Sequence, residues 1–220
     1  MVWSLHYLTI SLSATIPTEI GLLRNLTSVA MAKCGVFGDI PTELGNLKNL
    51  KLLAIMGNRL SGPIGIVLQN LTKLERIFIE HNAFTGPVSR EQWSVLGNAE
   101  ISTMYRNGFT GKLPDDIGEL FTNYSKIFDI EGNQFSGTIP ASLALLPQLQ
   151  WLDVSNNLFT GTIPDGLSAT TTLALQGNNF TGSVPDSVCE AVTGRGGKIT
   201  YECGGSLSCT CNCTCAGPYF

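Results

Sequence analysis

The stretch LQWLDVSNNLFTGTIP, residues 149–164, contains both halves of a unit that recurs along the chain. Its first half follows the pattern LxxLxLxxN, and its second half ends in FTGTIP. The last position of the second half recurs at 17, 41, 65, 89, 114, 140, 164 and 185, at steps of 24, 24, 24, 25, 26, 24 and 21 residues. So regular a step predicts a solenoid, in which each unit packs on its neighbours.

Each unit is expected to contain a short strand that is followed by a turn. The alternation in LxL directs two apolar side chains to the same face of the strand. A column at the turn consists of Cys34, Asn58, Asn82, Asn107, Asn133, Asn157 and Asn178. A buried Asn must have its amide satisfied, so this column is expected to form hydrogen bonds. Cys34 is expected to be a buried structural thiol in the same column.

A second column contains large apolar residues, which we expect to stack in the core. Its members are Leu12, Phe37, Leu60, Phe84, Phe109, Phe135, Phe159 and Phe180. The Gly that follows permits a tight backbone approach, and the Pro at the end of the unit helps to start the next turn. Segments 42–50 and 115–121 are therefore expected to form short helical or 3₁₀ turns.

These phrases resemble leucine-rich repeats, and the LxGxIPxxLGxL half resembles the plant-type subclass, over about residues 2–188. The resemblance implies an α/β solenoid, a right-handed superhelix with a concave parallel β-sheet and 3₁₀ or short helices on the convex side. It also implies that the Asn column bonds to turn backbone as a ladder. We divide the chain into a solenoid at 1–188, with about eight repeats of which the first is incomplete, and a Cys-rich cap or tail at 189–220.

The composition argues against several classes of function. Charged residues make up 14% of the 220 residues, and the formal net charge is −4, so a nucleic-acid partner is not expected. No apolar run approaches the roughly 20 residues of a membrane span, although one may lie outside this chain. There are only two histidines, His6 and His81, which leaves little material for His-based catalysis, and His81 has no nucleophile at a fixed spacing. We therefore predict no enzyme, no cofactor and no metal site.

The concave face is where we expect a ligand to bind. Strand side chains that do not point into the core face that side, and aromatic residues beside charges are typical of binding hot spots. The predicted ligand-binding residues are Arg76, Phe78, Glu80, His81, Tyr105, Arg106, Asp129, Glu131, Trp151 and Asp153. The alternative is that they are ordinary surface residues, since aromatic residues also favour strands.

Three of these residues, Asp129, Glu131 and Asp153, form an acidic group that has several interpretations. A solvated acidic patch is the simplest one. Carboxylates could also hold Ca²⁺, or act as a glycosidase pair. The flat sheet of a solenoid offers no deep, dry cleft to raise one pKa, which argues against the glycosidase.

Six of the seven cysteines lie close to the C-terminus, which suggests a disulfide-stapled cap and an oxidising compartment. The disulfide candidates are Cys189, Cys203, Cys209, Cys211, Cys213 and Cys215. Two alternatives remain open: a thiolate cluster that binds Zn²⁺ or Cu⁺, and cross-linking between chains.

The sequence carries N-x-S/T sequons, and the glycosylation candidates are Asn25, Asn70, Asn123 and Asn179. A fifth sequon, at Asn212, lies between cysteines and is the least suited. The start of the chain, VWSLHYLTISLSATIP, lies inside a repeat and lacks a basic leader region. We expect a degenerate first repeat rather than a signal peptide, and a chain that is a fragment or has its natural start elsewhere.

The resemblance extends to receptor-like kinase ectodomains and to polygalacturonase-inhibiting proteins, and it implies a binding function. We predict an extracellular or cell-surface recognition module that binds a protein, peptide or glycan through its concave face. One alternative is a secreted inhibitor of cell-wall-degrading hydrolases. Another is a structural or matrix protein that is cross-linked through the Cys-rich tail.

Overall fold

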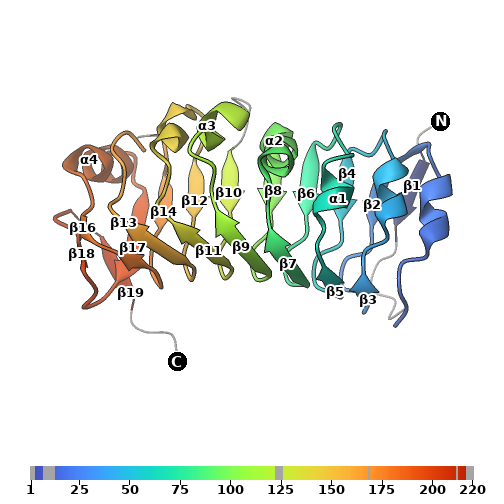
Figure 1. Cartoon of the computed structure of the whole chain (residues 1–220). Helices are drawn as coiled ribbons and strands as arrows, with labels where there is room; N and C mark the ends of the chain where they lie inside the picture. Colours follow the sequence, from blue (N-terminus) through green and yellow to red (C-terminus); the bar gives the residue numbers. More distant parts are fainter. Residues whose placement is uncertain (1–2, 7–12, 122–125, 168, 212, 217–220) are drawn as a thin grey trace.

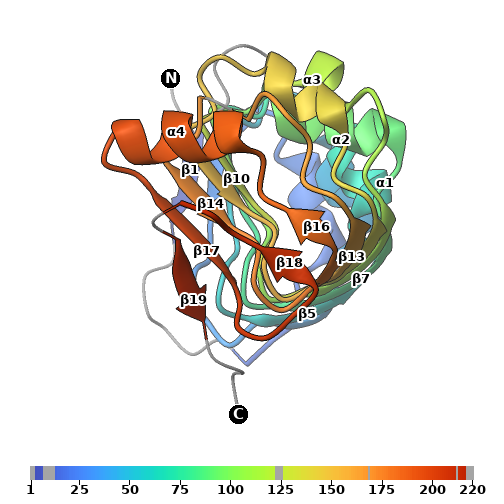
Figure 2. The ribbon, with the colours of Figure 1, turned by 90° about the vertical axis from the view of Figure 1, so that its left-hand side faces the viewer.

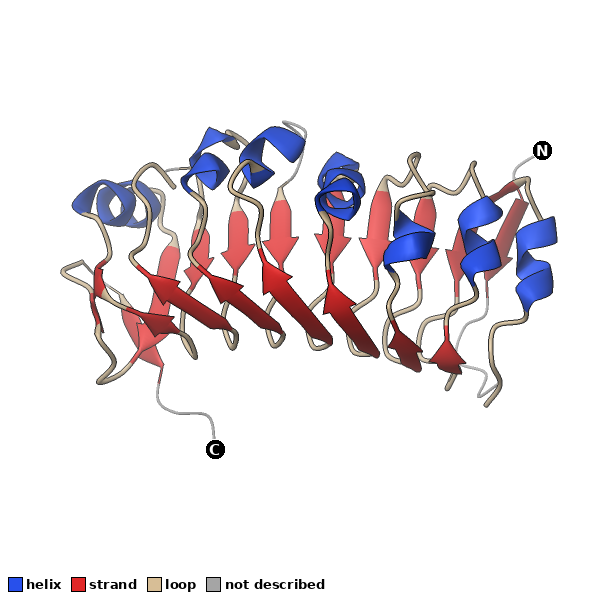
Figure 3. Cartoon of the chain, viewed as in Figure 1, coloured by secondary structure: helices blue, strands red, loops and turns tan. Residues whose placement is uncertain are grey.

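The structure is a computed structural model that describes residues 3–6, 13–121, 126–167, 169–211 and 213–216. The chain coils into a solenoid with two parallel sheets and a row of short helices (Figure 1). Most coils pass from a strand of one sheet to a strand of the other and then through a helical segment (Figure 3). This is the predicted leucine-rich-repeat architecture.

The larger sheet forms the predicted concave side and has ten strands among the residues that the structure describes. Neighbouring strands are parallel and pair residues one repeat apart; Leu52, for example, lies opposite Arg76. The sheet continues through two strands of the Cys-rich tail. Its strands, in spatial order, are β1 (Trp3–His6), β2 (Leu26–Ala30), β4 (Leu52–Ala54), β6 (Arg76–Phe78), β8 (Ile101–Thr103), β10 (Ile127–Asp129), β12 (Trp151–Asp153), β14 (Thr172–Ala174), β17 (Lys198–Glu202) and β19 (Thr214–Ala216).

A second parallel sheet lies on the opposite side of the core, and the repeat pattern did not predict it. From the fourth repeat phrase onward the Phe is buried while the next Ser or Thr is more exposed, as for Phe84 and Thr85. The Gly that follows looks strand-breaking in sequence, but Gly111, for example, adopts φ +94° within its strand. The strands are β3 (Phe37–Asp39), β5 (Arg59–Gly62), β7 (Ala83–Pro87), β9 (Gly108–Lys112), β11 (Gln134–Gly137), β13 (Leu158–Gly161) and β15 (Asn179–Phe180).

Helical segments close the third side of most coils, whereas the described residues between β13 and β14 form only turns. Viewed along the solenoid, the helices lie between the two sheets at the top (Figure 2). Pro17, Pro41 and Pro140 directly precede three of them, because proline has a fixed φ and lacks the N–H that the first turn leaves unpaired. The segments are η1 (Thr18–Leu22), η2 (Thr42–Asn46), α1 (Gly65–Leu68), α2 (Arg90–Asn98), α3 (Ile117–Leu120), η3 (Ala141–Leu145) and α4 (Asp186–Gly194). The turns expected within 42–50 and 115–121 are confirmed.

One apolar core runs along the solenoid between these three sides. The predicted ring column stacks within it, with Phe109 centred 6.3 Å from both Phe84 and Phe135. The prediction for Phe37 is wrong, since that side chain is 41% exposed and the guanidinium of Arg59 lies over its ring.

The error at Phe37 has a simple cause in the local spacing. The core position follows the Asn column by two residues, and in the second repeat Cys34 occupies that column. The core position is therefore Val36, which is buried. Leu12, another predicted member of the ring column, lies outside the described residues.

The Asn column forms the predicted hydrogen-bonded ladder. The Nδ2 group of Asn133 donates to the carbonyl oxygens of Met104 and Ile130, each at 3.1 Å, and its Oδ1 accepts from the backbone N–H of Phe109 at 3.1 Å. One amide thus joins two successive coils. The same pattern is present at Asn58, Asn82, Asn107, Asn157 and Asn178.

Cys34 is buried in the same column, as predicted, and its Sγ lies 3.3 Å from the carbonyl oxygen of Ala32. The tail has intramolecular disulfides, as predicted from its six cysteines, and the structure pairs Cys189 with Cys211, Cys203 with Cys215 and Cys209 with Cys213. A two-stranded sheet of β16 (Gly182–Ser183) and β18 (Leu207–Ser208) also holds the tail to the last repeat. The division of the chain into a solenoid and a Cys-rich tail at residue 188 stays a prediction. Both α4 and the larger sheet continue across this position.

We expect Asn133→Ala to lower the free energy of unfolding by about 3 kcal/mol, because it leaves several buried backbone groups without partners. Urea unfolding of the full chain measures this loss. Gln134→Ala is the matched control, since Gln134 is the adjacent amide and is exposed. Equal losses in the two variants would contradict a structural role for the ladder.

Candidate functional site

The candidate site is the outward surface of β6, β8, β10 and β12, which we call the concave face. The register aligns its side chains in files that run across the strands. One file reads Arg76, Ile101, Ile127 and Trp151, and another reads Phe78, Thr103, Asp129 and Asp153. Because neighbouring strands lie about 4.8 Å apart, four strands present a surface about 15 Å wide.

The aromatic residues of the concave face come from the repeats of β6, β8 and β12. Trp151 is 42% exposed, whereas Phe78 and Tyr105 are half-buried. Tyr105 packs edge-on against His81, with ring centroids 5.1 Å apart. Trp151 lies two strands further along, at about 10 Å from the Tyr105 repeat. The face therefore offers two separate aromatic points of contact.

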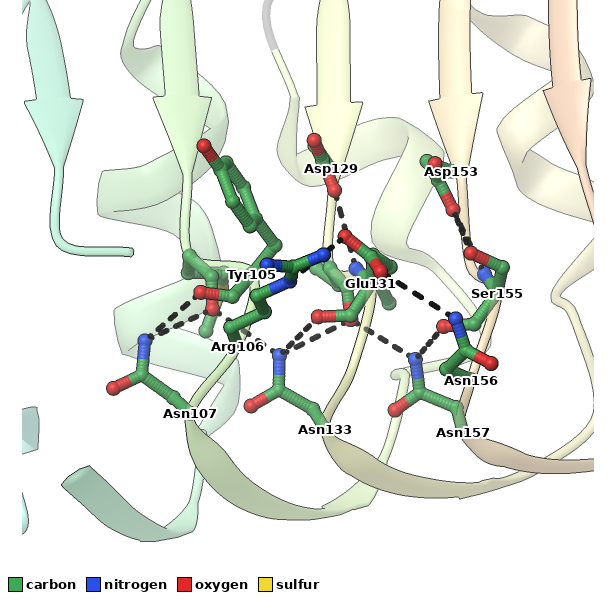
Figure 4. Close-up of polar contacts among 12 residues, drawn as sticks. Tyr105, Arg106, Asn107, Asp129, Glu131, Asn133, Asp153, Ser155, Asn156 and Asn157 are labelled. Carbon is green, nitrogen blue, oxygen red and sulfur yellow. Dashed lines mark hydrogen bonds and ion pairs between the residues drawn. The ribbon is translucent and has the colours of Figure 1, made fainter. Parts of the chain in front are cut away.

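An acidic pair, Asp129 on β10 and Asp153 on β12, lies beside Tyr105 and Trp151 on the concave face; Figure 4 shows the pair and Tyr105. Asp129 and Asp153 occupy the same register position on adjacent strands, so two like charges face each other. Asp129 accepts a hydrogen bond from the backbone N–H of Glu131 at 3.1 Å. Asp153 accepts from the backbone N–H and the hydroxyl of Ser155 at 2.9 and 2.6 Å.

Glu131 connects the acidic pair to its cationic and amide neighbours. One carboxylate oxygen lies 3.7 Å from the Nε of Arg106, and the other accepts a hydrogen bond from Asn156 at 3.4 Å (Figure 4). Its charge is thus partly balanced within the chain. In the contacts described above, the hydrogen-bond donors to Asp129 and Asp153 are uncharged N–H and O–H groups.

Burial raises the pKa of Asp129 to about 7, and the charges of Asp153, Glu131 and Glu80 act in the same direction. The hydrogen bond from the Glu131 backbone opposes this rise. Burial also raises the pKa of Asp153, against the hydrogen bonds from Ser155. The pKa of Tyr105 is raised by burial and by the nearby charge of Glu80. The pair therefore takes up a proton more readily than ordinary carboxylates.

The other predicted site residues differ in how accessible they are. Arg76 is exposed, and so are His81 and Arg106, which adopt φ near +53° at the turn before the Asn ladder. Glu80 is buried and accepts a hydrogen bond from Thr103 at 2.7 Å, so it stabilises the concave face and is little accessible to a ligand. Ligand binding by these ten residues stays a prediction.

Three residues of the polar network were not among the predicted site residues. Thr103, Ser155 and Asn156 fix the side chains of Glu80, Asp153 and Glu131. Ser155 and Asn156 directly precede the ladder residue Asn157, and Thr103 occupies the register position of Asp129. Alignment of the repeats is therefore the sequence signal that could have identified them.

Of the glycosylation candidates, Asn25 and Asn179 are exposed. The amide of Asn70 is already engaged, since it accepts from Lys48 and donates to the Ile66 carbonyl. Asn123 and Asn212 lie outside the described residues, and glycosylation stays a prediction. In the part of the chain that the structure describes, no helix has the length and apolar character that crossing a membrane requires.

Comparison with known families identifies one repeat directly. The family described as Leucine Rich Repeat matches residues 148–170, which include the stretch quoted first above. No curated protein sequence matches the chain.

Solved structures match most of the chain. The ectodomain of the receptor kinase GASSHO1/SCHENGEN3 of Arabidopsis thaliana, in complex with CASPARIAN STRIP INTEGRITY FACTOR 2, matches with a TM-score of 0.76 and 30% identity over 86% of this chain and 22% of that chain. PEPR1 with AtPEP1 matches with a TM-score of 0.80 and 29% identity over 97% and 32%. The plant peptide hormone receptor RGFR1 in complex with RGF2 matches with a TM-score of 0.71 and 26% identity over 89% and 34%. The chain thus spans about a third or less of each of these proteins.

We expect Asp129→Asn to stabilise the chain at pH 8 and to have little effect at pH 4. The raised pKa means that Asp129 contributes stability below pH about 4, and that this contribution is lost as the pH rises to about 7. The gain at pH 8 should be on the order of 2 to 4 kcal/mol, because one pKa unit corresponds to about 1.4 kcal/mol. Urea unfolding at both pH values measures it.

Asp115→Asn is the control for this prediction, because Asp115 is exposed and lies in a turn outside the concave face. It should change stability by less than about 0.5 kcal/mol at either pH. A gain for Asp129→Asn that is the same at pH 4 and pH 8 would show that ionisation is not its cause.

Proposed function

We propose that this chain, a leucine-rich-repeat protein similar to plant receptor-kinase ectodomains, is an extracellular recognition module that binds a peptide through its concave face. It acts by binding and not by catalysis. The observation that carries the proposal is the exposed Trp151 beside the aligned pair Asp129 and Asp153 on a sheet face that the core does not need. The similarity to solved ectodomains with bound partners, one of them described as a peptide hormone receptor, supports it.

The concave face has the composition of a binding hot spot. Trp, Tyr and Arg dominate such regions, and Trp151, Tyr105 and Arg76 all lie on the concave face. An extended peptide that crosses β6 to β12 would place side chains at both aromatic points, because successive residues of an extended chain advance about 3.3 Å. About five residues would therefore cover the 15 Å width.

The acidic pair indicates which charged group such a peptide should carry next to its apolar contacts. Two carboxylates at one register position repel each other, and a cationic group placed between them would replace this repulsion with two charge-assisted hydrogen bonds. The charge of Glu131 is already compensated by Arg106, so the negative charge that a ligand cation could compensate lies at Asp129 and Asp153. We propose that a Lys or Arg side chain, or a peptide N-terminus, occupies this position.

The placement outside the cell is supported by the tail. Its six cysteines all pair within the chain, as is usual where the environment is oxidising. This pairing also argues against the hypothesis of a matrix protein that is cross-linked through the tail. Glycan binding and inhibition of cell-wall-degrading hydrolases stay predictions, and no feature of the concave face favours them.

A random peptide library displayed on phage tests the proposal. Selection on the full chain should enrich peptides that combine a basic residue with apolar residues on both sides. Binding of synthetic versions should weaken at least about tenfold in Trp151→Ala, since hot-spot truncations cost about 2 kcal/mol or more. Leu158→Ala is the matched control, because Leu158 is a large exposed apolar residue on the second sheet. Selected peptides that bind Trp151→Ala as tightly as the unchanged chain would refute the proposal.

The same peptides should bind more weakly at pH 5.5 than at pH 8. The pKa of Asp129 near 7 means that it is protonated at the lower pH and no longer attracts a cation. Calorimetry at the two pH values should show a loss of about three- to tenfold. Asp129→Asn should remove most of this pH dependence, whereas a pH dependence that is unchanged in Asp129→Asn would place the cation elsewhere.

A further inference from the structure

The outward surface of the larger sheet continues from the repeats into the Cys-rich tail (Figure 2). Beyond β12 the next strands are β14 and then β17, which belongs to the tail. Thr172 pairs with Trp151 on one side and with Lys198 on the other. The file that contains Arg76 and Trp151 is therefore extended by Thr172 and Lys198. Lys198 stands two strands, or about 10 Å, from Trp151.

Lys198 points out of the sheet and presents its charge to the solvent. Its side chain is exposed, whereas the next residue along the strand, Ile199, is buried in the core. None of the ion pairs found in the described part of the chain includes Lys198. The carboxylate of Glu202, on the same face of β17, accepts a hydrogen bond from the backbone N–H of Gly177 at 2.9 Å. The ammonium group of Lys198 is therefore available to an anionic group of a ligand.

The strand that presents Lys198 is fixed on both sides. β17 pairs with β14 and with β19, and the disulfide Cys203–Cys215 links the end of β17 to β19. The hydroxyl of Thr200 donates to the side-chain carbonyl of Gln176, which follows β14, at 2.6 Å. The place of Lys198 on the face is thus set before a ligand arrives, which lowers the entropic cost of binding.

Lys198 and the acidic pair present opposite charges that lie too far apart to bind each other. Asp153 lies on β12, two strands from Lys198, and its register position is two residues further along the strand. The two positions are therefore about 12 Å apart, whereas an ion pair needs about 4 Å between its nitrogen and oxygen atoms. Trp151 and Thr172 lie beside the line that joins them. A ligand that satisfies both charges has to span this distance.

We propose that Lys198 is a further ligand contact, and that it binds an acidic side chain of the peptide. The inference rests on the proposed function, in which Asp129 and Asp153 bind a basic group. Successive residues of an extended peptide advance about 3.3 Å, so 12 Å corresponds to about three or four residues. The peptide therefore carries an acidic residue at this spacing from its basic residue, with an apolar residue between them that contacts Trp151. The tail thus selects the ligand as well as capping the solenoid.

Peptides selected on the full chain from the phage library give the first test. The enriched sequences should share an acidic residue about three or four positions from the basic one. Enriched peptides that bind through Trp151 but lack this acidic residue would overturn the inference and leave the proposed function standing. Failure to enrich any peptide would refute the proposed function, and the inference with it.

A charge reversal then locates the acidic residue. In calorimetry, Lys198→Glu should weaken binding of a selected peptide about three- to tenfold, because an attraction at the surface becomes a repulsion. A peptide with Lys in place of its acidic residue should instead bind Lys198→Glu at least about threefold more tightly than it binds the unchanged chain. Arg195→Glu is the matched control and should alter neither affinity, since Arg195 is exposed, has the same charge and lies in the turn between α4 and β17.

Two outcomes of the reversal would overturn the inference. Tighter binding of the reversed peptide to Arg76→Glu, and not to Lys198→Glu, would place the acidic residue at the opposite end of the file. Equal changes in Arg195→Glu and Lys198→Glu would show a general effect of net charge. If Lys198→Glu does not fold, the spacing of charges in the peptides selected on the unchanged chain decides.

Discussion

A side-chain amide that is repeated once per coil satisfies the backbone groups on which the whole solenoid depends. Between the two sheets the chain must turn inside the molecule, where water cannot reach its N–H and C=O groups. Asn133 meets this requirement for two coils at once, with bonds to Met104, Ile130 and Phe109. A shorter or purely apolar side chain would leave these groups without partners. Each coil needs one such amide. The amides therefore recur at the length of one coil, which is near 24 residues.

The ladder and the stacked rings stabilise the fold from within, so the outward side chains of the concave face are not needed for packing the core. Core side chains such as Ile77 and Leu152 point inward from β6 and β12, while Arg76 and Trp151 on the same strands point outward. Residues can therefore change along one file without disturbing the packing behind it. The pair Asp129 and Asp153 illustrates this freedom, since two like charges at one register position add nothing to the fold.

Most of the fold could be predicted from the sequence, because the repeat fixes which residues face inward. The ladder, the order of the concave files and the helical turns all follow from spacing. The second sheet could not be predicted, since its Gly residues tolerate positive φ inside a strand, as at Gly111. The expectation for Phe37 is wrong because Phe37 stands directly before its Gly, where the other repeats have Ser or Thr, and the core position one residue earlier is Val36. At the candidate site, spacing gave the neighbours of Asp129 but not the burial that raises its pKa.

The two ends of the solenoid are held to very different degrees. At the second repeat the ladder position holds Cys34, whose single thiol can make fewer hydrogen bonds than the amide of Asn58. At the opposite end three disulfides fasten the last coils. The molecule therefore has a mechanical polarity. Under tension the coils around Cys34 would separate before the coils that the disulfides fasten, and β6 to β12 would keep their shape while the coils around Cys34 open.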